Sequence, residues 1–183
     1  QPSAWVQRWS HLVRKGGVVL DVACGHGRHA RWFFQRNHPL VVVDRSQEAI
    51  AFVSDFLPAT ACEAVLADIE AGPWPFAGRQ FDAVIVTNYL WRPLLPTLLA
   101  SLAPGGVLIY ETFTQGNETV GKPSRPDFLL RTGELLETCR GLRVVAFEEG
   151  FHENPPRFIQ HIAAVREAAE TAGLPAPVRY FLP

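Results

Sequence analysis

The sequence of 183 residues has no methionine, only three cysteines and no cluster of basic residues. Three widely spaced cysteines cannot make the disulfide framework of a small secreted domain, so we expect reduced, mostly buried thiols in a cytoplasmic protein. No apolar run approaches the ~20 residues that span a bilayer, and no secretory signal pattern is present, so no membrane partner is expected. Because methionine is absent, we expect the native start to lie upstream of Gln1.

The charge is almost balanced, with 17 Lys and Arg against 18 Asp and Glu and a formal net charge of -1. A protein that holds nucleic acid mainly through its phosphates needs an excess of basic residues, so this balance disfavours such a partner. Apolar residues make up 48% and charged residues 19%, which is typical of globular domains. A chain of this length fills one core well, so we expect a single domain over residues 1–183.

Short apolar runs alternate with helix-forming segments over most of the chain. This alternation predicts right-handed crossovers and a mostly parallel sheet, while a hairpin-like segment at 150–157 predicts an antiparallel end. We therefore expect an α/β fold: a Rossmann-like, doubly wound, seven-stranded sheet with an antiparallel C-terminal hairpin and helices on both faces. The expected strands are 18–22, 40–43, 62–67, 81–86, 107–110, 142–149 and 158–166, and the expected helices are 5–15, 30–35, a segment capped by Ser46 and closed by Pro58, 94–102, and 132–139 capped by Thr132.

Two segments flank this pattern and are candidates for covering a site. Residues 1–17 contain an N-terminal helix that ends at Gly16-Gly17; it either crosses a ligand site or simply packs on the sheet. Residues 112–127 are polar and contain glycine and proline, and loops of this length inside compact domains are often functional covers. We expect this second segment to cover the substrate, with candidate contacts from Phe113, Asn117, Glu118 and Arg125.

Three successive expected strands end in an aspartate, namely Asp21, Asp44 and Asp68. In such sheets ligands bind beyond the carboxyl ends of the strands, where the strand order reverses. Carboxylates near a core are costly without partners, so a ligand rich in hydroxyl and amino donors would account for them.

The segment 25–30 satisfies the Gly-x-Gly-x-x-Ala pattern of dinucleotide-binding turns. Asp21 precedes the glycines, where a pyrophosphate would meet a negative charge but a cationic amino acid portion would be favoured. Asp44 follows at the spacing of an acid that binds ribose hydroxyls. An adenosine ligand with a positive tail therefore fits better than a dinucleotide.

Taken together, these residues resemble the class I S-adenosylmethionine-dependent methyltransferases over nearly the whole chain. Residues 19–27 resemble the first motif of that family, Asp44 its ribose-binding acid, and residues 67–69 its adenine-side acid. Residues 102–108 resemble the turn before its fifth strand. Within the family, residues 128–135 are similar to the small tellurite-resistance-like methyltransferases.

The resemblance implies S-adenosylmethionine as the cofactor. It implies that Asp21 lies near the methionine portion, that Asp44 binds the ribose, and that Asp68 accepts a hydrogen bond from adenine. Arg28 either reaches the cofactor carboxylate or lies solvated on its helix. The full implied cofactor set is Asp21, Ala23, Gly25, Gly27, Arg28, Asp44, Arg45, Asp68, Ile69, Asn88 and Tyr89.

The reaction implied is in-line methyl transfer to a heteroatom, in which positioning supplies most of the rate and a base is needed only for a protonated nucleophile. Tyr89 and Glu111 are the catalytic candidates. Glu118, His152 and His161 are further candidate bases, although each taken singly is more typical of a structural side chain. Segment 88–91 lacks the prolines of the Asn/Asp-Pro-Pro-Tyr motif of adenine and glutamine methyltransferases, which disfavours those substrates.

No separate substrate domain is evident, which favours a small-molecule substrate, with a protein or RNA substrate as the alternative. A nicotinamide-dependent oxidoreductase is disfavoured by Asp21, and a non-catalytic partner subunit by the intact acidic series. Cys24, His26 and His29 resemble a metal-ligand set, but the cysteine lies within the cofactor turn, so no metal is expected.

Overall fold

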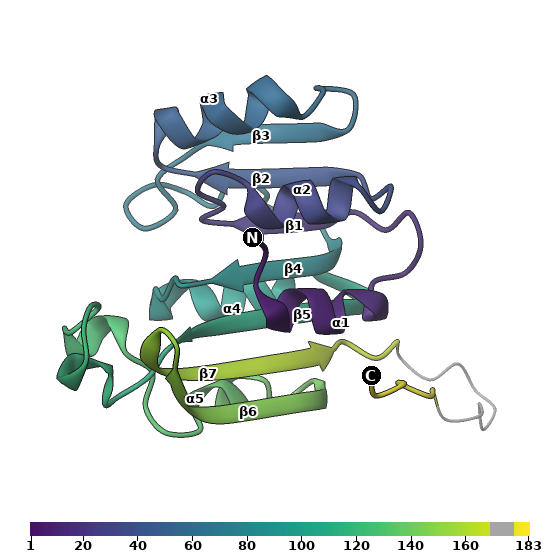
Figure 1. Ribbon diagram of the computed structural model, residues 1–183. Coiled ribbons are helices and arrows are strands. Elements are labelled where there is room, and N and C mark those ends of the chain that lie inside the picture. Colours follow the sequence, from purple (N-terminus) through teal and green to yellow (C-terminus); the bar gives the residue numbers. More distant parts are fainter. Residues whose placement is uncertain (169–177) are drawn as a thin grey trace.

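The computed structural model describes residues 1–168 and 178–183. Its centre is a seven-stranded sheet in the order β3-β2-β1-β4-β5-β7-β6, which Figure 1 shows from one face. The strands from β3 to β5 in this order are parallel, and β7 runs antiparallel to both β5 and β6. The expected doubly wound sheet with an antiparallel C-terminal hairpin is confirmed.

The strands are β1 (Val19–Val22), β2 (Leu40–Asp44), β3 (Cys62–Leu66), β4 (Phe81–Thr87), β5 (Leu102–Phe113), β6 (Arg143–Glu153) and β7 (Pro156–Val165). The α-helices are α1 (Ala4–Trp9), α2 (Arg28–Phe34), α3 (Gln47–Phe56), α4 (Leu95–Ala100) and α5 (Glu134–Thr138). Short 3-10 turns are η1 (Ser10–Leu12), η2 (Arg92–Leu94), η3 (Asn117–Thr119) and η4 (Pro126–Phe128).

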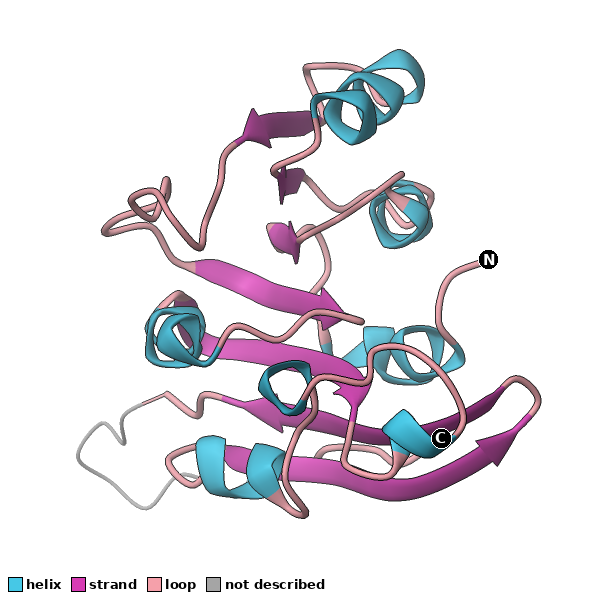
Figure 2. Ribbon diagram, turned by 90° about the vertical axis from the view of Figure 1, so that its left-hand side faces the viewer, coloured by secondary structure: helices cyan, strands magenta, loops and turns pink. Residues whose placement is uncertain are grey.

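Helices α1, α2 and α3 cover one face of the sheet, and α4 and α5 cover the other, as the edge-on view in Figure 2 shows. Successive residues of β1 alternate between these faces, so Val19 belongs to the buried cluster that contains Trp9, while Leu20 belongs to the one that contains Leu98. Burying such a side chain stabilises the fold by roughly 1.5–3 kcal/mol. The continuous apolar runs in the sequence are therefore explained by strands that are covered on both sides.

The order of the strands reverses beside β1. The chain moves outward from β1 through β2 to β3 and then returns to place β4 on the other side of β1. The carboxyl ends of these strands lie at the left edge of Figure 1, together with the segment after β5 and the β6–β7 turn. Ligands of such sheets bind at this reversal.

Several expected helix boundaries are corrected. The N-terminal helix, predicted over 5–15, ends at Trp9 and is followed by one 3-10 turn. The backbone is extended at Val13, whose side chain is buried, so the helix does not continue. The helix predicted to reach residue 102 ends at Ala100, because Leu102 pairs with Phe81 in the sheet. The predicted cap Ser46 is confirmed, since its Oγ accepts from the Ala49 N–H.

The predicted cap Thr132 is wrong. Gly133, in the left-handed region, precedes α5, and the Glu134 carboxylate accepts from the Arg131 N–H at 2.7 Å. The hairpin predicted at 150–157 is confirmed, but its strands are longer than expected, because β6 and β7 extend through most of this segment and leave only Asn154 and Pro155 between them. The residues at this end of the hairpin are mostly polar and exposed, so an apolar pattern could not predict that the strands continue there.

The predicted cover segment begins later than expected, because Thr112 and Phe113 still belong to β5. Within residues 1–168 and 178–183, no helix combines the length and the apolar character needed to cross a membrane.

Candidate active site

A cavity of about 150 Å³ lies at the carboxyl ends of β1, β2, β3 and β4. We call it the first cavity. Its lining contains many of the predicted cofactor residues and adds Ala67 and Glu70. The residues that line it are Ala23, Asp44, Arg45, Ala67, Asp68, Ile69, Glu70 and Tyr89.

Asp44 is held by backbone donors from two loops. Its Oδ2 accepts from the Gly25 N–H and its Oδ1 from the Ser46 N–H, both at 2.8 Å. Each carboxylate oxygen can accept a further hydrogen bond. The carboxylate is thus fixed in direction and can accept hydrogen bonds from a pair of ligand hydroxyls.

Asp68 organises the turn after β3. Its Oδ1 accepts from the N–H groups of Glu70 and Ala71 at 2.9 and 3.0 Å. These hydrogen bonds hold the pKa of the Asp68 carboxyl below its ordinary value, so the group is an anion at neutral pH. Its exposed position at the rim of the first cavity suits an acceptor for an amino group.

The two glycines of the loop after β1 have different roles. Gly25 has φ +52°, and a side chain added there would meet nothing within 4 Å, so this residue leaves room for a ligand. Gly27 has φ +68°, and a Cβ there would lie 2.7 Å from Val53 Cγ2 of α3. Gly27 therefore permits packing against α3, a role that the motif alone did not reveal.

Asp21 is buried beneath this loop and is 2% exposed. Its Oδ2 has no hydrogen-bond partner among the residues that the structure describes. Burial raises the pKa of Asp21 to about 8, although the Ala30 N–H and the charge of Arg28 oppose this shift. A buried carboxyl with an unpartnered oxygen suits a cationic ligand group, which would both pair with it and ionise it.

Tyr89 and Asn88 follow β4. Burial and nearby Glu70 raise the pKa of the Tyr89 phenol, so it stays neutral and is unsuited to act as a base at neutral pH. Asn88 is exposed, has φ +54°, and its backbone N–H donates to the Glu111 carbonyl at 3.0 Å. Arg28 is also exposed and donates to Thr87 Oγ1 at 3.5 Å.

A second cavity, of about 130 Å³, lies under the start of α1 beside β5, β6 and β7. Sequence reasoning named Glu111, His152 and His161 singly but did not bring them together, and it missed Arg8 and Arg157. The signal that joins them is the antiparallel register, which places Glu111 opposite His161. This register can be used only once the order of the strands in the sheet is known. The lining residues are Ser3, Ala4, Trp5, Arg8, Glu111, Glu148, His152, Arg157 and His161.

The four predicted substrate contacts, Phe113, Asn117, Glu118 and Arg125, line neither of these cavities. Asn117 is 1% exposed, and its amide donates to the Pro123 carbonyl and accepts from the Phe158 N–H. Glu118 accepts from the Gly116 N–H, and Arg125 pairs with Asp127. In this structure Asn117 anchors the cover segment to β7.

Cys24, His26 and His29 do not converge. The His26 ring lies against Phe52, whereas His29 Nε2 accepts from the Ser3 N–H at 3.2 Å. Burial lowers the pKa of His29 to about 4, which keeps this acceptor neutral. Across the described part of the chain, no three His, Cys, Asp or Glu side chains are grouped to hold a metal ion.

Comparisons with known proteins agree with this geometry. Residues 19–106 match the family model described as a methyltransferase domain. The fold is similar to the crystal structure of TehB from Haemophilus influenzae, with a TM-score of 0.72 and 18% identity over 86% of this chain. This chain covers only 60% of that protein's length.

Two further solved structures are similar over most of both chains. An S-adenosylmethionine-dependent methyltransferase from Mesorhizobium loti has a TM-score of 0.70 at 17% identity, covering 90% of this chain and 99% of that one. A TehB-like methyltransferase from Corynebacterium glutamicum has a TM-score of 0.67 at 16% identity, covering 91% and 89%. No curated protein sequence matches.

Proposed function

We propose that this chain transfers a methyl group to a heteroatom of a small molecule. Its domain match and its fold support an S-adenosylmethionine-dependent methyltransferase of class I that resembles TehB. The fold and domain imply S-adenosylmethionine as the cofactor. The observation that carries the proposal is the first cavity, where the fixed Asp44 carboxylate, the anionic Asp68 and the open Gly25 loop meet.

The residues present fit this cofactor. In the proposed arrangement Asp44 accepts from the ribose hydroxyls, while Asp68 and the Ile69 N–H bind the adenine edge. Asp21 pairs with the ammonium group through its unpartnered Oδ2, and Gly25 gives the methionine portion room. When bound, S-adenosylmethionine supplies a methyl group already activated by the sulfonium.

The chain's own contribution is then to align the acceptor and to exclude water. Positioning of this kind can supply about 7–11 kcal/mol of a reaction barrier. Tyr89 lines the first cavity with a buried hydroxyl that has no partner among the described side chains, which suits a neutral hydrogen-bond donor. Glu111 lies one strand further along the sheet, in the second cavity.

A small substrate is supported by the size of the second cavity, about 130 Å³, since the first cavity is assigned to the cofactor. The exposed residues Glu118 and Arg125 belong to the proposed cover segment and form its outer surface. A protein or RNA substrate would have to dock from outside, with only the reacting group entering.

Calorimetry with S-adenosylhomocysteine and with NAD tests the cofactor assignment. We expect binding of the former alone, and a stronger response to NAD would overturn the proposal. A second assay measures S-adenosylhomocysteine release across small thiols, amines, alcohols and oxyanions, with an RNA fraction and a protein fraction alongside. Turnover confined to RNA or protein would refute a small-molecule substrate.

A further inference from the structure

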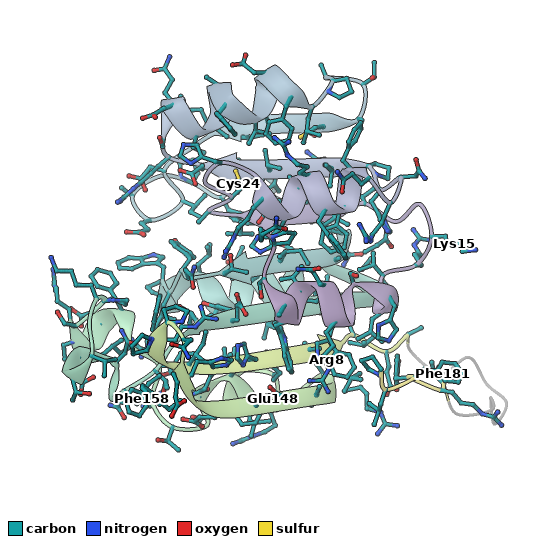
Figure 3. The ribbon with its side chains drawn as sticks, in the orientation of Figure 1. Arg8, Lys15, Cys24, Glu148, Phe158 and Phe181 are labelled. Atoms are coloured by element: carbon teal, nitrogen blue, oxygen red, sulfur yellow. The ribbon has the colours of Figure 1, made fainter. Side chains whose placement is uncertain are left out.

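The second cavity contains a cluster of titratable side chains that the cofactor does not use. Its walls come from segments far apart in sequence: the start of α1, the end of β5, and both strands of the β6–β7 hairpin. In Figure 3 Arg8 of α1 and Glu148 of β6 lie close together near this region, and their side chains form an ion pair at 2.8 Å.

Glu111 and His161 form the inner part of the cluster. They are directly opposite each other in the β5–β7 register, and His161 Nε2 lies 3.4 Å from Glu111 Oε2. Both are deeply buried, at 2% and 4% exposed. A buried pair of this kind is seldom favourable for stability, because apolar side chains of similar volume would do as well or better.

The chemical state of the pair is set by its neighbours. Burial raises the pKa of Glu111, but contacts with His161 and Ser3 outweigh this and hold it below its ordinary value. Glu111 is therefore a carboxylate, which favours a proton on His161 Nε2 and leaves the lone pair on Nδ1. The polar contact of the His161 side chain with the described residues is the one between Nε2 and Glu111.

The His161 ring is held in place on two sides. The Trp5 ring stacks on it at 4.9 Å with an interplanar angle of 22°. The His152 ring meets it edge-on at 5.5 Å. A carboxylate that orients an imidazole whose second nitrogen is available is the arrangement of a general base.

The pair lies close to the cofactor loop. Glu111 pairs with Thr87 at the end of β4, and its carbonyl accepts from the Asn88 N–H. Ser3, at the rim of the second cavity, donates from its N–H to His29 of α2, the helix that follows the glycine loop. Strands are about 4.8 Å apart, so β7, which carries His161, lies about 10 Å from β4 and about 14 Å from β1. A small molecule seated against His161 can therefore reach the crevice at β1 and β4.

The other charged groups facing the pair are few. Arg8 is neutralised by Glu148. Burial, Arg157 and His161 together lower the pKa of His152, so it is neutral at pH 7. Arg157 contributes a positive charge, and its buried Nε has no partner among the described residues.

We propose, on the basis of the function proposed above, that His161 is the general base of a substrate subsite in the second cavity and that Glu111 positions it. The substrate is then a small molecule whose nucleophile arrives protonated, as a hydroxyl or an amine, rather than as a thiolate or an oxyanion.

In the proposed step, the nucleophile's lone pair forms the bond to the methyl carbon while its proton moves to His161 Nδ1. The carbon–sulfur bond breaks, and its electron pair stays on sulfur as S-adenosylhomocysteine leaves. Glu111 stabilises the imidazolium until its proton passes to water after release of the methylated product. No oxidant or second cofactor is needed.

The test uses a library of small alcohols, phenols, amines, thiols and selenite, with release of S-adenosylhomocysteine as the signal. We expect turnover of hydroxyl or amine compounds, and a fall of about 10²–10⁴-fold in kcat for His161→Gln. S-adenosylhomocysteine binding should change less than twofold. His11→Gln and Glu153→Gln, at exposed sites that line neither cavity, are the matched controls and should retain full activity.

Glu111→Gln distinguishes positioning from mere packing. Without the carboxylate the imidazolium is less stable, so the acidic limb of the kcat/KM profile should move to lower pH as kcat falls.

Turnover confined to thiols or selenite would overturn the proposal, as would full activity of a folded His161→Gln variant. Normal S-adenosylhomocysteine binding without turnover of any hydroxyl or amine compound would overturn it as well, while leaving the cofactor assignment intact. Loss of cofactor binding by the unaltered chain would instead refute the function proposed above.

Discussion

The first and second cavities are assembled in opposite ways. The first uses residues at the ends of consecutive strands, and its key carboxylate, Asp44, is held by backbone N–H groups of neighbouring loops. The second joins residues 3–8 to Glu111 and to the hairpin around residues 148–161, and its core is a contact between two side chains. The first arrangement is set by backbone geometry, whereas the second depends on each partner being present.

The largest effect is expected where one side chain supports another. His161→Phe leaves the Glu111 carboxylate buried without its partner, which should lower the free energy of unfolding by about 3 kcal/mol. Adding Glu111→Leu removes the buried charge, so the double variant should regain most of the loss. Urea unfolding measures both. A double variant no more stable than His161→Phe would show that shape rather than charge is decisive at this position.

The next effect concerns the backbone-held carboxylate. Asp44→Ala should weaken S-adenosylhomocysteine binding by about 10²–10³-fold, since charge-assisted hydrogen bonds contribute about 1.5–3 kcal/mol each. Glu118→Ala, in the cover segment, is the control and should leave the affinity nearly unchanged. Calorimetry gives both values. Equal losses would mean that the cover segment binds the cofactor too, and that the boundary drawn between the two regions is wrong.

The same contrast explains how much the sequence predicted. The sheet, its antiparallel end and much of the first cavity were accessible because each signal is local: an apolar run, then Asp44 or Asp68, then a turn. Glu70 was not predicted, because a glutamate at this position has no sequence feature that distinguishes it from an ordinary exposed side chain. The Glu111–His161 pair was not predicted because it depends on the antiparallel register between β5 and β7, which brings together two residues 50 positions apart.

The cover segment shows a different limit. Its length and polarity predicted an exposed loop, and from its composition Asn117 resembled a ligand contact. Asn117 is instead buried with both ends of its amide engaged, one with Pro123 and one with Phe158. Composition cannot distinguish a polar group that awaits a ligand from one that anchors its own loop, because the partners are backbone groups from elsewhere in the chain.

A smaller effect separates the two glycines of the loop after β1. Gly27→Ala should lower the free energy of unfolding by about 2 kcal/mol, because its Cβ would lie 2.7 Å from Val53 and its φ is +68°. Gly25→Ala has open space, so it should destabilise the fold by only about 1 kcal/mol through its backbone and should mainly weaken cofactor binding. Thermal unfolding and calorimetry of both variants test this division. Partial rescue of Gly27→Ala by Val53→Ala would identify α3 as the source of the clash.

The last effect is a pH dependence at Asp21. With its pKa raised to about 8, Asp21 is largely protonated at pH 7 in the free protein. A cationic ligand group favours the carboxylate, so binding should release close to one proton at pH 7. Affinity for S-adenosylhomocysteine should therefore rise roughly tenfold per pH unit from pH 6 to 7.5 and level off above pH 8.

Calorimetry at pH 7 in buffers of different ionisation enthalpy counts that proton directly. Asp21→Asn keeps the shape of the side chain but cannot ionise, so it should bind more weakly with no proton released. Unaltered proton release in Asp21→Asn would assign the proton to another group. Asp44 is already held by two N–H groups, whereas Asp21, beneath the glycine loop, has an oxygen without a partner among the described residues. The charge of Asp21 is therefore expected to depend on the ligand. Like the Glu111–His161 pair, and unlike Asp44, Asp21 depends on a partner group for its charged state.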